Sequence, residues 1–194
     1  MAVIVGLLRF LAAVNSFILS IGRVIAGAAI GIMVIVILIQ VFFRYILGNA
    51  LPWPDEAARF LMLWMTGLIA PSAYRQGGFV SIDMVTEALP KLIGQTIILV
   101  LLIIALAVLL VGFNYGLNHV NSGWLFASSS LKIPLNWFGG ELISVKLAWM
   151  YMSLAVGMGL LILVNIELIL RAILKFIDPN WTPPETDGVL IRAE

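Results

Sequence analysis

The residues best able to do chemistry lie together near position 55. A Pro-Asp-Glu run at 54–56 is followed by Arg59. In a helix Asp55 and Arg59 are four residues apart and Glu56 and Arg59 are three apart, so either acid can pair with the arginine on one helix face. Arg44, at the end of the preceding apolar segment, can join the same cluster. On chemistry alone, the cluster fits either a salt bridge at a membrane surface or a docking patch for another protein.

Catalytic and metal-binding chemistry have little support in the sequence. Paired carboxylates that act in acid–base catalysis need a nucleophile, a metal ligand or a pocket beside them, and no such motif accompanies this pair. The chain has no cysteine and one histidine, His119, which we expect in a solvated loop. This composition excludes disulfides, thiolate metal sites and histidine clusters. The sequence therefore predicts no enzymatic activity, no cofactor and no metal.

The composition is that of a membrane protein. Of the 194 residues, 62% are hydrophobic and 11% are charged. Soluble domains have about 45–50% apolar and about 25% charged residues. The polar surface is too small to cover a water-soluble globule, so lipid must solvate much of the chain. A net charge of +1 gives no reason to expect a nucleic-acid partner.

We expect an all-α integral membrane protein with four transmembrane helices. A spanning helix needs about 20 apolar residues, and the backbone must satisfy its own hydrogen bonds in lipid. The four apolar segments are residues 24–43, 57–74, 92–113 and 147–170. They form one transmembrane domain over residues 1–175, followed by a short cytoplasmic tail over residues 176–194.

Two further segments have the pattern of helices that lie on the membrane surface. Residues 2–21 are apolar but are interrupted by polar side chains, which fits an N-terminal interfacial helix or an extension of the first span. Residues 79–89 alternate between apolar and polar and predict a short amphipathic helix between the second and third spans. Seven Lys and Arg residues on the side of the termini, against four on the other, predict that both termini are cytoplasmic.

Inside the apolar segments, some residues are spaced for contacts between or within helices. Glu167 and Arg171 are four residues apart, which predicts an ion pair at the cytoplasmic boundary rather than a functional intramembrane acid. Two pairs of small residues have the spacing that lets helix backbones approach closely: Gly27 with Gly31, and Ser153 with Gly157.

The segment from residue 43 to residue 83 resembles a known family. It reads Arg44-Tyr45, then Trp53-x-Asp55-Glu56-x-x-Arg59, then Trp64-x-x-Gly67, then Arg75-x-Gly77-Gly78-x-Val80-x-Ile82-Asp83. This order resembles the small-permease (DctQ-like) subunit of TRAP (tripartite ATP-independent periplasmic) transporters. The chain departs from the family pattern at Asp55, where a glutamate is usual, and at Phe79, where a histidine is usual.

The resemblance implies a non-catalytic scaffold in the bacterial inner membrane. Such subunits support a larger, elevator-type membrane subunit that holds the substrate and sodium sites, and a periplasmic solute-binding protein delivers the substrate, often an organic acid. The residues that we expect at the interface with these partners are Arg44, Tyr45, Trp53, Asp55, Glu56, Arg59, Trp64, Arg75 and Asp83.

Two other functions remain open from the residues themselves. A small integral-membrane enzyme or redox-complex subunit would need clustered acids, histidines or cysteines at membrane depth, and the sequence lacks them. A self-contained homo-oligomeric transporter would be expected to have an internal repeat and broken helices near the midplane, which are not visible in the sequence.

Overall fold

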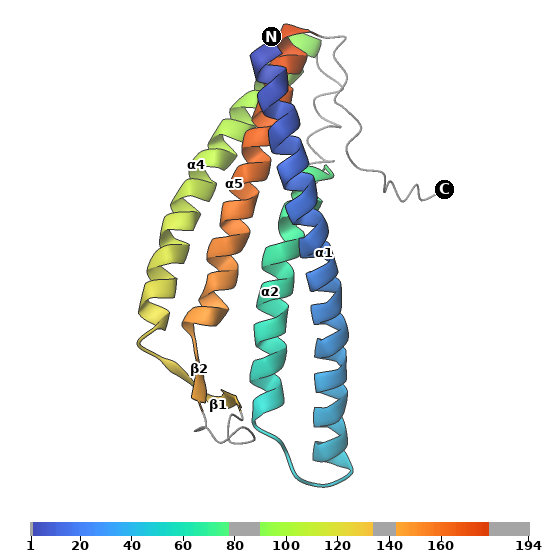
Figure 1. The fold of residues 1–194 in the computed structure, drawn as a ribbon, viewed down its shortest axis with the longest axis vertical. Coiled ribbons are helices and arrows are strands. Elements are labelled where there is room, and N and C mark those ends of the chain that lie inside the picture. Colours follow the sequence, from blue (N-terminus) through green and yellow to red (C-terminus); the bar gives the residue numbers. More distant parts are fainter. Residues whose placement is uncertain (1, 78–89, 134–142, 179–194) are drawn as a thin grey trace, which may run out of the picture.

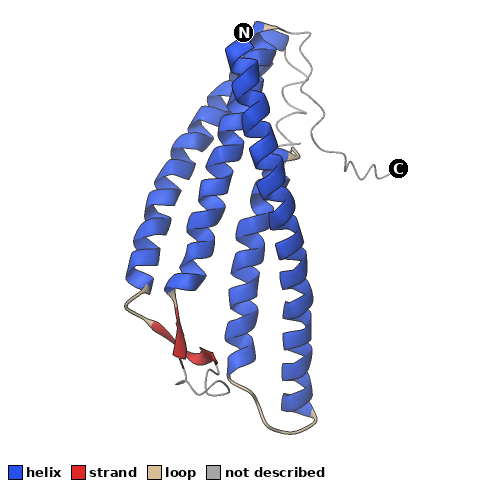
Figure 2. Cartoon of the chain, in the orientation of Figure 1, coloured by secondary structure: helices blue, strands red, loops and turns tan. Residues whose placement is uncertain are grey.

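The computed structural model describes residues 2–77, 90–133 and 143–178 (Figure 1). Within these residues the chain forms four helices and two short strands (Figure 2). The elements in chain order are α1 (Ala2–Tyr45), α2 (Trp53–Arg75), α4 (Lys91–Gly123), β1 (Ala127–Ile133), β2 (Ile143–Lys146) and α5 (Ala148–Ile177).

The helices form an open row rather than a closed bundle. α4 packs against α5, α5 packs against α2, and α2 packs against α1. α1 also crosses α5 near the end where the chain begins, and the helices spread apart toward the opposite end (Figure 1). We call these the N-terminal end and, after the antiparallel pair of β1 and β2 that lies there, the hairpin end of the molecule (Figure 1). An open row buries little apolar surface, and only 6% of the most apolar stretch of α4 is buried.

Three of the helices are long and apolar enough to cross a membrane: Ile4–Tyr45, Leu92–Gly123 and Ala148–Ile177. Helix α2 is not among them, because it is less apolar than the other three helices along its whole length. Its 23 residues nevertheless rise about 34 Å, which is close to the thickness of the hydrocarbon core. The structure thus confirms a helical membrane protein, while a fourth span in α2 stays a prediction.

The N-terminal segment does not form a separate interfacial helix. α1 runs without a break from Ala2 to Tyr45, so residues 2–21 extend the first span. Among the polar residues that suggested a surface helix, Arg9 and Ser20 are exposed, whereas Asn15 is buried. It lies on an inward face with Leu8, Ala12 and Leu19, which are also buried. Their spacing of three and four residues places them on one side of the helix.

The region after the third expected span also differs from the prediction. α4 continues ten residues beyond position 113 to Gly123, so His119 lies in a helix and not in a loop. Its ring lies 5.7 Å from that of Tyr151. The chain then forms an antiparallel hairpin in which Lys132 pairs with Ser144. Asn114, Asn118 and Asn121 lie inside the last part of α4. Asparagine is polar but is tolerated in a helix, so polarity did not predict where the helix ends.

The remaining sequence predictions fall largely outside the described residues. The amphipathic helix expected at 79–89 lies there, as does the tail beyond Asp178. α5 itself runs to Ile177, seven residues beyond the predicted end of the fourth span.

Candidate functional site

Most of the predicted interface residues gather at the hairpin end. Arg44 and Tyr45 end α1, and Trp53, Asp55, Glu56 and Arg59 lie in the first two turns of α2. Tyr45 is 76% exposed, and the centroid of its ring lies 5.9 Å from the Arg44 guanidinium carbon. The other predicted residues lie elsewhere: Trp64 in the middle of α2, Arg75 at the N-terminal end, and Asp83 outside the described residues.

Glu56 ties the hairpin to α2. Its Oε2 accepts hydrogen bonds from the Ser128 hydroxyl, from the Ser130 hydroxyl at 2.6 Å and from the Leu131 backbone N–H at 3.0 Å. The Ser130 backbone N–H lies 3.3 Å away on the same side. A carboxylate surrounded by donors is favoured in its charged form. The hydrogen bonds, that from Ser128 first, therefore hold the pKa of Glu56 below its ordinary value.

Among the described residues, Arg59 does not form the salt bridge that its spacing from Asp55 and Glu56 allows. Asp55 and Arg59 are both exposed. The Glu56 carboxylate instead accepts hydrogen bonds from β1, a segment more than 70 residues away in sequence. Spacing along one helix identifies possible ion pairs, but an exposed ion pair adds little stability in water. A carboxylate that can reach several hydrogen-bond donors elsewhere binds those donors instead.

Loss of the Glu56 carboxylate should release the hairpin. We expect Glu56→Ala to increase hydrogen exchange at the Ser130 and Leu131 amides about tenfold, because charge-assisted bonds of about 1.5–3 kcal/mol are removed and Leu131 keeps only the Ser128 hydroxyl as a side-chain acceptor. Since folding lowers the pKa of this acid, its contribution to stability is present above its ordinary pKa and is lost as pH falls through the lowered value. In the wild type, exchange corrected for its intrinsic rate should therefore rise only in acid. Asp55→Ala is the matched control, and an equal effect there would contradict this role.

Two contacts hold the middle of α2 against the first half of α5. The indole N–H of Trp64 donates a hydrogen bond to the backbone carbonyl of Trp149 at 3.1 Å. Near it, a Cβ atom on Gly67 would lie 2.5 Å from the Ser153 carbonyl oxygen, and one on Gly157 would lie 3.0 Å from Gly67. The helices therefore meet backbone to backbone. This confirms the predicted close approach at Ser153 and Gly157.

The other predicted pair of small residues makes no such contact within the chain. A Cβ atom on Gly27 or on Gly31 would meet nothing within 4 Å among the described residues. Both glycines lie on the exposed side of α1.

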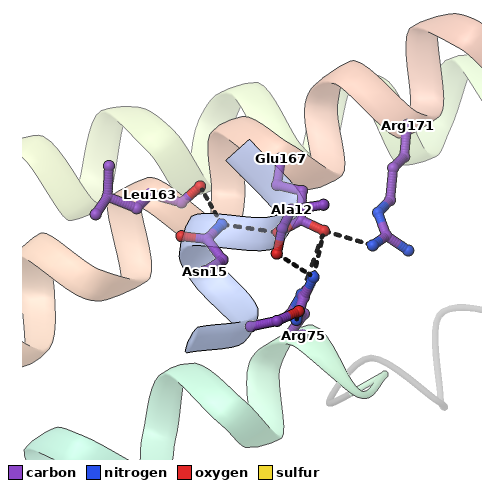
Figure 3. Close-up of polar contacts among 7 residues, drawn as sticks. Ala12, Asn15, Arg75, Leu163, Glu167 and Arg171 are labelled. Atoms are coloured by element: carbon purple, nitrogen blue, oxygen red, sulfur yellow. Dashed lines mark hydrogen bonds and ion pairs between the residues drawn. The ribbon is translucent and has the colours of Figure 1, made fainter. Parts of the chain in front are cut away.

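At the N-terminal end, Glu167 of α5 lies fully buried at the centre of a polar cluster (Figure 3). Its Oε1 accepts hydrogen bonds from Nε and Nη2 of Arg75, at 3.2 and 2.9 Å. Its Oε2 accepts one from Asn15 Nδ2 at 2.7 Å. Helices α1, α2 and α5 thus meet at a single carboxylate. A buried charge is tolerated when it is paired and its remaining lone pairs are satisfied, as they are here.

The cluster also uses backbone and hydroxyl groups. Arg75 donates to the Ser16 hydroxyl at 2.8 Å and to the Ala12 carbonyl at 3.2 Å, and its side chain is only 4% exposed. Asn15 donates in addition to the Leu163 carbonyl at 3.3 Å. Three helices are therefore fixed at this end in both distance and rotation. Arg75 makes these contacts inside its own chain, whereas the sequence suggested a role at a subunit interface.

The predicted pair between Glu167 and Arg171 is confirmed. Arg171 Nη2 contacts Glu167 Oε1, and the arginine side chain remains 26% exposed. The sequence did not indicate the two partners from other helices, Arg75 and Asn15. The available signal was that the second and fourth expected spans end on the same side, where an acid and an arginine next to apolar sequence each need a partner.

Comparison with known protein families shows to which family the chain belongs. The sequence profile described as "Tripartite ATP-independent periplasmic transporters, DctQ component" matches residues 33–175, well over half of the chain. The chain belongs to this family. No protein of curated function matches it.

As a DctQ component, the chain is a membrane component of a TRAP transporter in the bacterial inner membrane. The resemblance found in residues 43–83 is confirmed. The matched residues include all of α2, α4 and the hairpin, together with Glu56, Arg75, Glu167 and Arg171. Asn15 precedes them, in the extension of α1 that crosses α5. The DctQ family is a transporter component and not a known enzyme family.

Proposed function

We propose that this DctQ chain is the small, non-catalytic scaffold subunit of its TRAP transporter. It supports a larger, elevator-type membrane subunit and helps to dock a periplasmic solute-binding protein. The complex then takes up an organic acid with sodium as the coupling ion. The observation that carries the proposal is the family match over residues 33–175, since the family is one component of a tripartite system.

A scaffold must be rigid, and the arrangement of α2 supports this part of the proposal. α2 is tied to other elements at three heights: to β1 through Glu56, to α5 through Gly67 and Trp64, and to α1 and α5 through Arg75. These ties act on different parts of one helix, so each limits its movement independently. The exposed apolar faces of α1 and α4 are left for lipid or for the large subunit.

We place the hairpin end in the periplasm and both termini in the cytoplasm. The excess of Lys and Arg on the side of the termini supports this orientation. Helix α2 then serves as the fourth span over about residues 57–74. Its polar first turns lie at the periplasmic boundary, and its last residue, Arg75, lies in the buried cluster at the other boundary.

Charge reversal at the hairpin end tests the docking role. Arg59 is exposed there, and none of the described residues forms an ion pair with it. We expect Arg59→Glu to weaken binding of the solute-binding protein to the complex in nanodiscs about tenfold or more, because like charges at an interface repel. Lys132→Ala, a change at an exposed cation on β1, should alter the affinity less than about threefold. Unchanged affinity in Arg59→Glu would contradict a docking role for this surface.

A further inference from the structure

Arg171 has hydrogen-bonding capacity that the described residues do not use. A guanidinium has five N–H donors. One of its Nη atoms contacts Glu167, whose two oxygens are already shared with Arg75 and Asn15. Its Nε is buried, and none of the described residues accepts a hydrogen bond from it. The buried Nε cannot reach an acceptor outside the chain, but the arginine side chain is 26% exposed, so part of its guanidinium is open to an external acceptor.

The depth of Arg171 identifies the surroundings. Trp149 at the start of α5 packs edge-on against Trp124, with ring centroids 6.1 Å apart, and both rings are half exposed near the hairpin end. Between Trp149 and Arg171 the one charged residue of α5, Glu167, is fully buried, so the exposed surface of the helix is uncharged over this length. From Trp149 to Arg171 the helix rises about 33 Å, about one hydrocarbon thickness. Arg171 therefore lies at the opposite boundary, among lipid headgroups.

The neighbours of Arg171 fit a headgroup as well. Lys175 is exposed one turn further along α5, on the same helix face. On the other side of Arg171, toward the hydrocarbon core, Ile166 is an exposed apolar side chain that can contact acyl chains. Two cations beside an exposed apolar side chain match the two parts of an anionic phospholipid, and arginine in particular pairs with phosphate oxygens in a forked geometry.

We propose that Arg171 and Lys175 bind the phosphate group of an anionic phospholipid at the N-terminal end of the molecule. The unused donors of Arg171 point to the phosphate, and Lys175 adds charge one turn away. The bound lipid joins the outside of the Glu167 cluster to the membrane. This inference concerns the chain by itself and does not depend on the proposed scaffold function.

Native mass spectrometry of the full chain in non-ionic detergent, titrated with dioleoylphosphatidylglycerol, tests the proposal. We expect saturable binding in the wild type, binding about tenfold weaker in Arg171→Gln, and no change in Arg44→Gln, the matched control at the hairpin end. Arg171→Lys, which keeps the charge, should lose less than Arg171→Gln. Equal binding by the wild type and Arg171→Gln would overturn the proposal.

Two further measurements keep the test decisive. If Arg171→Gln loses its helical structure, Lys175→Gln decides: weaker lipid binding supports the site, and unchanged binding overturns it. Inorganic phosphate is titrated in parallel. Displacement of the lipid by an equal concentration of phosphate would show a site for a soluble anion and overturn the assignment to lipid, whereas retention of the lipid supports it.

Discussion

Replacing Glu167 with alanine should destabilise the protein more than any other single change at a charged residue described here. The substitution removes the carboxylate that accepts two hydrogen bonds from the Arg75 guanidinium, which is only 4% exposed. Asn15 and Arg171 lose the same partner. Removing one member of a buried pair costs about 3–5 kcal/mol, a large part of the stability of a small domain. We expect this loss in denaturant unfolding in detergent, monitored by circular dichroism.

Two matched variants show whether the buried charge is the cause. Glu167→Gln keeps the volume and one acceptor oxygen, so it should lose stability but less than alanine. Asp55→Ala removes an exposed carboxylate at the other end and should change stability by less than about 0.5 kcal/mol. If Glu167→Ala unfolds at the same denaturant concentration as the wild type, the cluster does not hold the three helices together.

Adding a single methyl group at Gly67 should separate α2 from α5. The new Cβ would lie 2.5 Å from the Ser153 carbonyl oxygen, a backbone atom that cannot move without shifting its helix. Overpacking of this kind costs about 1–3 kcal/mol. We therefore expect Gly67→Ala to lower the thermal unfolding temperature and to weaken the nearby hydrogen bond of Trp64, which indole fluorescence can report.

Gly27→Ala gives a control with the opposite expected sign. Nothing among the described residues lies within 4 Å of a Cβ at Gly27, so alanine meets no clash within the chain. Alanine in a helix interior is favoured over glycine by about 1 kcal/mol. The isolated chain should therefore become slightly more stable. Equal loss of stability at Gly27 and Gly67 would show that helix propensity or synthesis, and not the α2–α5 contact, determines the result.

The helices could be predicted well from the sequence because a helix that crosses lipid must be apolar over about 20 residues. Hydrophobic length alone located the cores of α1, α4 and α5, and the polar start of α2 was found from Asp55 and Glu56. The ends were missed by up to 22 residues at the start of α1. We took polar residues to mark the ends of spans. Asn15, however, lies inside α1, where its side chain donates a hydrogen bond to the buried Glu167.

The polar contacts were predicted only where they are local. The Glu167–Arg171 pair follows from a spacing of four residues, and the structure contains it. Among the described residues, the similar spacing of Arg59 from Asp55 and Glu56 gives no ion pair, because β1 supplies better donors to Glu56. Contacts between residues more than 70 positions apart, such as Glu56 with Ser130 and Arg75 with Glu167, depend on how the helices are arranged. Spacing along the chain contains no information on that arrangement.

The measurement that tests the central claim most directly is the co-purification of this chain from native membranes. The chain is extracted in a mild detergent, and the proteins that accompany it are identified and counted by mass spectrometry. A TRAP small subunit should bring with it, in equimolar amount, a larger membrane protein with many more spans, and Gly67→Ala should recover less of it. Recovery of the chain alone, or only with further copies of itself, would contradict the scaffold function.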